Sequence, residues 1–127
     1  MNRIDTSVLY VEDDNLSRSY AEKMLSITVE KFEVAHNGKE ALEKILSENF
    51  LPEYIITDLK MPDMNGLDMI AMIKKIKSYN PKIIVITGHS EIDTLDDILK
   101  NEIVEIFQKP IDFAEILKCI KETKEMK

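Results

Sequence analysis

The sequence predicts an α/β domain in which helices cover both faces of a five-stranded parallel sheet, a doubly wound (βα)5 arrangement. Along the 127 residues, short apolar runs bounded by breakers alternate five times with longer amphipathic stretches. One of these runs, Lys82–Thr87, is apolar without alternation, as expected for a strand that is covered on both faces. Repeated strand-then-helix order indicates parallel strands that are joined by right-handed crossovers.

The first half of the chain supplies three of the expected strands. Ser7–Val11 is a compact apolar run with two valines, and it stops at acidic residues. Phe32–Ala35 is a shorter run with a charged residue within it, which predicts a more exposed strand. Tyr54–Asp58 is followed by Pro62 and Gly66, which disfavour regular structure. We therefore expect a buried strand that ends at a carboxylate.

Two amphipathic helices are expected between these strands. The first is predicted from Leu16 to about Thr28 with Asn15 as its N-cap, and the second from Glu40 to Ser47 after an Asn-Gly turn. Their inward faces are predicted to be Leu16, Tyr20, Met24 and Ile27 in the first helix, and Ala41, Leu42, Ile45 and Leu46 in the second.

The second half continues the same alternation. A third helix follows Gly66, and the strand Lys82–Thr87 comes after an Asn-Pro break. A helix is expected over Glu91–Lys100, then a strand over Ile103–Phe107, and a last helix from Asp112 to about Lys124. The inward residues are predicted to be Leu67, Ile70, Ile73 and Ile76 in the third helix, and Ile116, Leu117 and Ile120 in the last.

Size and composition limit the classes of protein. We expect one domain over residues 1–127, with residues 120–127 as a frayed helix end or the start of a linker. The formal charge of −7 argues against a general affinity for nucleic acid or anionic membranes. The single cysteine allows no intramolecular disulfide. Neither a signal peptide nor a membrane span is seen, so a cytoplasmic location is expected.

Polar side chains stand where the expected strands end. Glu12, Asp13 and Asp14 follow the first strand, Asp58 ends the third, Thr87 ends the fourth, and Lys109 follows the fifth. Of the three acids, Asp14 is expected to be a surface or capping residue and not a ligand. Because the carboxyl ends of parallel strands share one edge of a sheet, these groups are expected to converge. Clustered carboxylates repel one another unless a cation sits among them, and hard oxygen ligands favour Mg²⁺.

Such a cluster has two roles open to it. Asp58 could be a nucleophile that accepts a phosphoryl group, with Thr87 and Lys109 stabilising the phosphoryl oxygens. Alternatively, the cluster only binds a divalent ion.

Four segments in this order resemble the receiver domains of two-component response regulators, of the chemotaxis-regulator type. They are Val-Glu-Asp-Asp at 11–14, Asp-Leu-Lys-Met-Pro-Asp-Met-Asn-Gly at 58–66, Val-Ile-Thr-Gly at 85–88 and Gln-Lys-Pro at 108–110. The resemblance covers nearly the whole chain. It implies the flavodoxin-like strand order 2-1-3-4-5.

The resemblance also implies a role for each residue of the metal site. Asp58 would accept a phosphoryl group from a sensor histidine kinase or a phosphotransfer protein. Asp13 and Asp58 would bind Mg²⁺ directly, Glu12 would act through water, and the backbone carbonyl of Lys60 would complete the set. Mn²⁺ could replace Mg²⁺.

By the same resemblance, the other site residues would form a switch. Thr87 and Lys109 would contact the phosphoryl group, next to a Lys109–Pro110 bond that is usually cis in the family. The family usually has an aromatic residue where this chain has Ile106, and Phe107 lies on the opposite side of the strand. The face made by 91–100, 103–107 and 112–124 would bind a target, an output domain or a second copy of the chain.

A receiver catalyses only its own phosphorylation and dephosphorylation, so the expected role is a switch and not a conventional enzyme. One alternative is a degenerate receiver that binds partners without phosphorylation, which Ile106 keeps open. The other is a metal-dependent phosphatase with an aspartate nucleophile. Such enzymes commonly carry a second aspartate two residues later, where this chain has Lys60.

Overall fold

The computed structural model describes residues 3–47, 50–88 and 102–125. The strands are β1 (Ile4–Val11), β2 (Val29–Ala35), β3 (Tyr54–Asp58), β4 (Lys82–Thr87) and β5 (Ile103–Gln108). The helices are α1 (Asn15–Thr28), α2 (Gly38–Leu46), α3 (Gly66–Lys74) and α6 (Phe113–Glu125). The helix expected over Glu91–Lys100 lies outside the described residues.

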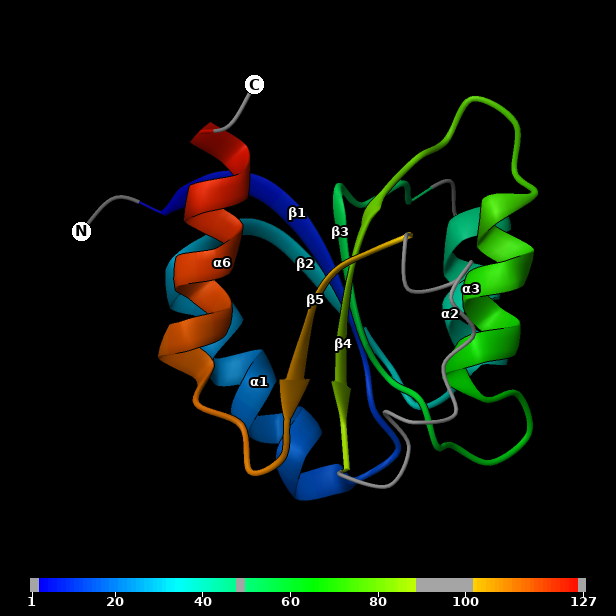
Figure 1. Ribbon diagram of the computed structural model, residues 1–127, viewed down its shortest axis with the longest axis horizontal. Helices are drawn as coiled ribbons and strands as arrows, with labels where there is room; N and C mark the ends of the chain where they lie inside the picture. Colours follow the sequence, from blue (N-terminus) through cyan, green and yellow to red (C-terminus); the bar gives the residue numbers. More distant parts are fainter. Residues whose placement is uncertain (1–2, 48–49, 89–101, 126–127) are drawn as a thin grey trace.

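The five strands form one parallel sheet in the order β2-β1-β3-β4-β5. Helices α1 and α6 lie on one face, and α2 and α3 lie on the other (Figure 1). The predicted doubly wound sheet and its strand order are therefore confirmed. Within the described ranges, no helix is long and apolar enough to cross a membrane.

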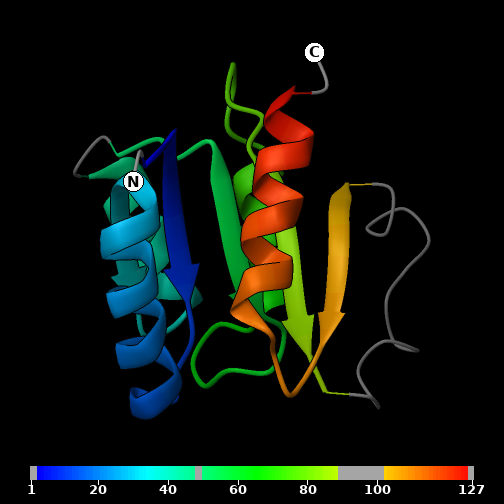
Figure 2. The ribbon, with the colours of Figure 1, turned by 90° about the vertical axis from the view of Figure 1, so that its left-hand side faces the viewer.

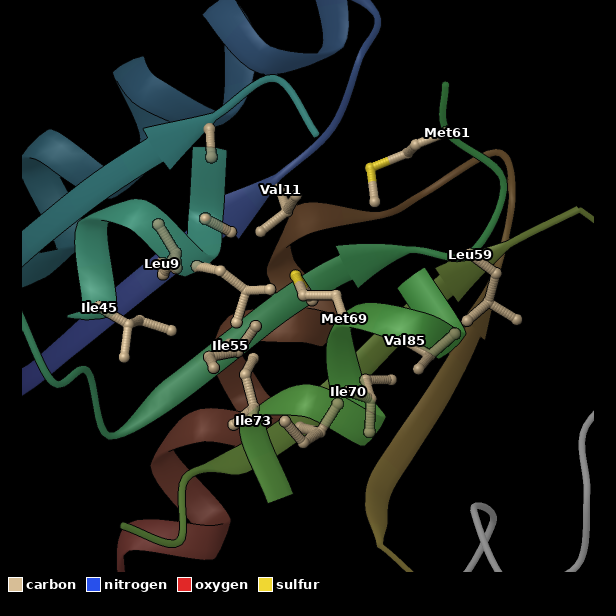
Figure 3. Packing of buried hydrophobic residues seen from close by; sticks show 14 residues of the cluster. Leu9, Val11, Ile45, Ile55, Leu59, Met61, Met69, Ile70, Ile73 and Val85 are labelled. Carbon is tan, nitrogen blue, oxygen red and sulfur yellow. The ribbon is translucent and has the colours of Figure 1, made fainter. Parts of the chain in front are cut away.

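The central strand β3 explains why its sequence lacks polar alternation. All five of its residues are buried. Ile55 points into the cluster that α2 and α3 cover, which Figure 3 shows from close by. Ile56 points into the opposite cluster, together with residues of α1 and α6. Since both faces are covered, burial of both sets of apolar side chains stabilises the strand that carries Asp58.

Several predicted boundaries are wrong. Strand β1 begins at Ile4 and not at Ser7, and β2 begins at Val29, directly after α1. The N-cap of α1 is Asp14, whose carboxylate accepts a hydrogen bond from the Ser17 amide at 2.8 Å. Asn15, the predicted cap, is the first residue of the helix. Both residue types can cap a helix, so the sequence alone does not choose between neighbours.

The predicted buried face of α1 is also wrong except at Met24, which packs against the core. Leu16, Tyr20 and Ile27 are 82%, 56% and 60% exposed, whereas Ala21 and Leu25 are fully buried. Ala21 has no side chain beyond Cβ, so α1 can pack closely on the sheet at this point. Large apolar residues at helical spacing therefore predict the wrong buried face when a small residue such as alanine makes the closest contact with the sheet.

The other described helices follow their predicted faces more closely. In α2 the prediction fails only at Leu46, which is 63% exposed. Leu67 and Ile76 of the third predicted face are partly buried, and Met69 is buried beside them. The remaining predicted inward residues are buried or pack against the core: Ala41, Leu42, Ile45, Ile70, Ile73, Ile116, Leu117 and Ile120.

Candidate functional site

The carboxyl edge of the sheet gathers the polar residues that the sequence singles out. The strands run parallel, and the arrowheads of β1, β4 and β5 point toward the same edge in Figure 2. The site is therefore assembled from four separate strand ends.

Glu12 is the most deeply buried acid of this edge, at 1% exposure. Its amide donates to the Ala35 carbonyl at 3.0 Å, and its Oε2 accepts from the Asp14 amide at 3.2 Å. Oε1 has no hydrogen-bond partner among the described residues and lies 3.4 Å from the Lys109 Nζ. Burial raises the pKa of Glu12, and this effect outweighs the lowering by the Asp14 amide.

Asp58 ends β3 and is 4% exposed. Its Oδ2 accepts a hydrogen bond from the Lys109 Nζ at 2.5 Å, and its Oδ1 accepts one from the Lys60 amide at 3.2 Å. The Gly66 amide donates to the Leu59 carbonyl at 2.9 Å. The loop after β3 thus turns back onto the end of the strand, and its Lys60 amide helps to hold the Asp58 carboxylate.

Lys109 follows β5 and bridges the two buried carboxylates. Partial burial lowers the pKa of the Lys109 ammonium, but its hydrogen bond to Asp58 and the charges of Asp58 and Glu12 outweigh that effect, so the pKa is raised overall. The Lys109 amide donates to the Thr87 carbonyl at 2.9 Å. The Lys109–Pro110 peptide bond is cis. Lys109 therefore brings a positive charge to the edge.

Thr87 ends β4 next to this cluster. The preceding residue, Ile86, pairs with Asp58 on the neighbouring strand β3. Thr87 is fully buried, and within the described part of the chain its Oγ1 has no hydrogen-bond partner. A buried hydroxyl is costly when it lacks a partner, so the Thr87 hydroxyl is suited to donate to a group bound at this edge.

The acids of this edge fit a divalent cation. Glu12, Asp13 and Asp58 each offer one oxygen, and these three oxygens lie within 4.8 Å of one another. Glu12, whose buried Oε1 has no hydrogen-bond partner among the described residues, is one of these three acids. Carboxylate oxygens are the donors that Mg²⁺ prefers.

The structure brings together the predicted carboxylates and Lys109, and it separates the predicted switch residues. Ile106 packs against the cluster under α2 and α3, and Phe107 against the cluster under α1 and α6. Two residues that contact the site were not predicted from sequence: Gly66, whose amide donates to the Leu59 carbonyl, and Arg18, whose guanidinium donates to the carbonyls of Glu12 and Asp13. An arginine near a helix N-terminus, where cations are disfavoured, is a signal that could have pointed to Arg18.

Replacing Glu12 with glutamine is expected to stabilise the metal-free protein at pH 7 by about 1 kcal/mol, because it removes a poorly satisfied buried charge. A carboxyl whose pKa is raised by folding costs stability above its unfolded pKa, here 4.5. The gain should therefore shrink as the pH falls toward that value. Urea unfolding in EDTA at several pH values measures it.

Glu43→Gln is the matched control, because Glu43 is exposed on α2. A gain of the same size at all pH values would contradict the charge explanation.

The family model described as the response regulator receiver domain matches residues 8–121. The chain belongs to this family. Among curated relatives of this receiver domain, the transcriptional regulatory protein ZraR of Klebsiella oxytoca is 29% identical over 118 residues. The DNA-binding transcriptional regulator NtrC of Escherichia coli K12 is 31% identical over 118 residues.

The matches cover 91% and 89% of the receiver domain but only 26% and 24% of those two relatives. The chain thus spans about a quarter of their length. Among solved structures, a CheY-like receiver domain protein from Methanospirillum hungatei JF-1 is 25% identical with a TM-score of 0.83. That match covers 97% of this chain and 96% of the other. The receiver domain is consistent with a place in two-component signalling, and its acidic cluster is compatible with a bound metal.

Proposed function

We propose that this receiver domain accepts a phosphoryl group on Asp58 from a histidine kinase or phosphotransfer protein, with Mg²⁺ bound. The observation that carries the proposal is the environment of Asp58. Its nearly buried carboxylate contacts Lys109 and lies within reach of two further carboxylates at one sheet edge. A carboxylate held in a fixed position by such partners can act as a nucleophile in phosphoryl transfer.

The transfer is a displacement at phosphorus. An Oδ of Asp58 forms a bond to phosphorus while the bond between phosphorus and the donor's leaving atom breaks, and the leaving atom keeps the electron pair. The Lys109 ammonium and the Thr87 hydroxyl donate to the phosphoryl oxygens. Glu12, Asp13, Asp58 and the Lys60 carbonyl would hold Mg²⁺, which supplies positive charge for those oxygens when bound.

The surface beside Lys109 favours a protein as the donor. A largely apolar cavity of about 370 Å³ opens there, between α1 and the start of α6. Leu16 and Tyr20 line it and are largely exposed, and Tyr20 makes an edge-to-face contact with Phe113. Apolar side chains exposed together beside a reactive group are typical of an interaction site. This geometry suits a switch that meets a protein phosphodonor, and we expect that meeting to take place in the cytoplasm.

The switch would pass through the pairing of β4 and β5. Thr87 pairs with Gln108, and Val85 pairs with Ile106 in the same ladder. A shift of Thr87 toward the phosphoryl group would therefore be felt along β5. The partner would bind the face of β5, α6 and residues 91–100, of which the last segment is outside the described residues.

Incubation with acetyl phosphate, followed by intact-mass spectrometry, tests the proposal. We expect one phosphoryl adduct that forms with Mg²⁺ and does not form when EDTA is present from the start. Amide NMR of the same sample should show shifts at Ile106 and Phe107. Absence of an adduct would contradict the proposal and favour a phosphorylation-independent interaction module. Shifts confined to the metal pocket would contradict only the switch.

A further inference from the structure

We propose that Arg18 is a positioning residue that holds the metal-binding loop in its working shape. The inference rests on the proposed Mg²⁺ site. The Arg18 Nη1 donates to the carbonyl oxygen of Glu12 at 2.9 Å and to that of Asp13 at 3.3 Å. Its Nη2 donates to the Asn15 Oδ1 at 2.5 Å. One guanidinium thus ties together the main chain of two of the three clustered acids.

The location of this arginine needs an explanation. Arg18 is the fourth residue of α1, and a cation near a helix N-terminus is disfavoured by the helix dipole. The planar guanidinium offers several donors in a rigid fork, which a lysine ammonium does not. The three acceptors of Arg18 all lie in the segment from Glu12 to Asn15 that leads from β1 into α1.

The hydrogen bond from Arg18 adds a third restraint on Glu12. Its amide is held by the Ala35 carbonyl, its Oε2 by the Asp14 amide, and its carbonyl by Arg18. The Glu12 Oε1, which has no hydrogen-bond partner among the described residues, is therefore held in a fixed direction, toward the Lys109 Nζ. Asp13 is exposed, so it has little packing to hold it, and Arg18 restrains its carbonyl directly.

Two effects of Arg18 on a bound cation oppose each other. Its positive charge repels the cation, so loss of the charge alone would strengthen binding. Its hydrogen bonds restrain the ligands in advance, so loss of the fork would weaken binding. The guanidinium points at carbonyl oxygens, and those acceptors partly offset its charge. The structure thus favours restraint as the larger effect.

Two variants separate these effects. Arg18→Lys keeps the charge and loses the fork, and Arg18→Met loses both. We expect both variants to bind Mg²⁺ about tenfold more weakly by isothermal titration calorimetry, as is found when groups that orient metal ligands are removed. The rate of phosphorylation by acetyl phosphate should return to the wild-type value at saturating Mg²⁺. A role in overall stability alone would not give this recovery.

Arg3→Met is the matched control. Arg3 also donates to a backbone carbonyl of α1, that of Ser26 at 2.9 Å, near the opposite end of the helix. It should leave Mg²⁺ affinity unchanged. Unchanged Mg²⁺ affinity in Arg18→Lys with tighter binding in Arg18→Met would overturn the inference in favour of a charge effect. Wild-type affinity in both variants would also overturn it, because neither the charge nor the hydrogen bonds of Arg18 would then matter. If wild type binds no Mg²⁺, the proposed function fails together with the inference.

Discussion

Replacing Asp58 with asparagine is expected to remove the phosphoryl adduct completely. The amide has nearly the shape of the carboxylate, so the fold should persist, but it has no negative oxygen to attack phosphorus. Asp58 is also the carboxylate that the Lys109 ammonium contacts most closely, so a phosphoryl group on Asp58 would lie beside that positive charge. Intact-mass spectrometry after incubation with acetyl phosphate and Mg²⁺ gives the result directly.

Asp63→Asn is the matched control for this experiment. Asp63 lies in the loop after β3, is exposed, and has a left-handed φ of 67°, a conformation that asparagine tolerates well. The control removes the same charge a few residues away and should keep the adduct. An adduct that survives in Asp58→Asn would place the phosphoryl group on another residue and contradict the proposed mechanism.

Replacing Gly66 with alanine is expected to cost about 3 kcal/mol in the free energy of unfolding, at the upper end of overpacking effects. A Cβ at this position would lie 2.3 Å from the Asp58 carbonyl oxygen and 2.9 Å from the Leu59 Cα. Both neighbours are backbone atoms, which cannot rotate away as the end of a side chain can. Urea unfolding measures the loss, and reduced phosphorylation should accompany it because the clash displaces Asp58.

Gly38→Ala provides a graded comparison. There a Cβ would lie 2.9 Å from the Met64 carbonyl oxygen and 3.0 Å from the Met64 Cγ, so the overlap is smaller and one neighbour is a flexible side chain. A loss in Gly38→Ala as large as in Gly66→Ala would show that the distance to Asp58 is not what matters. It would point instead to the loss of glycine as such.

The strands and the polar residues that follow them could largely be predicted from local patterns, whereas the strand order was implied only by the resemblance to receiver domains. Buried parallel strands are apolar throughout, and ligand groups follow them directly, as at Asp58 and Thr87. The chain's own periodicity was a poorer guide to the helix faces. Leu16 and Tyr20 have the spacing of core residues, yet they line a surface cavity while Ala21 faces the sheet.

The residues that hold the site in place could not be predicted in the same way, since their roles depend on contacts between segments that no local pattern encodes. That Gly66 must lack a side chain follows from how the loop turns back on Asp58. That Arg18 reaches the carbonyls of Glu12 and Asp13 follows from the path between β1 and α1. Burial of Glu12 likewise depends on its tie to Ala35 in a neighbouring strand.

The ion pair between Asp58 and Lys109 joins residues that are 51 positions apart in the chain. Lys109 follows β5, which is an edge strand, and such a contact forms only after a long stretch of chain has closed. A molecule in which β1, β3 and β4 have paired but β5 has not would display the carboxylates without their ammonium partner. Pairing of β5 therefore supplies the positive charge that offsets the two buried carboxylates at this edge.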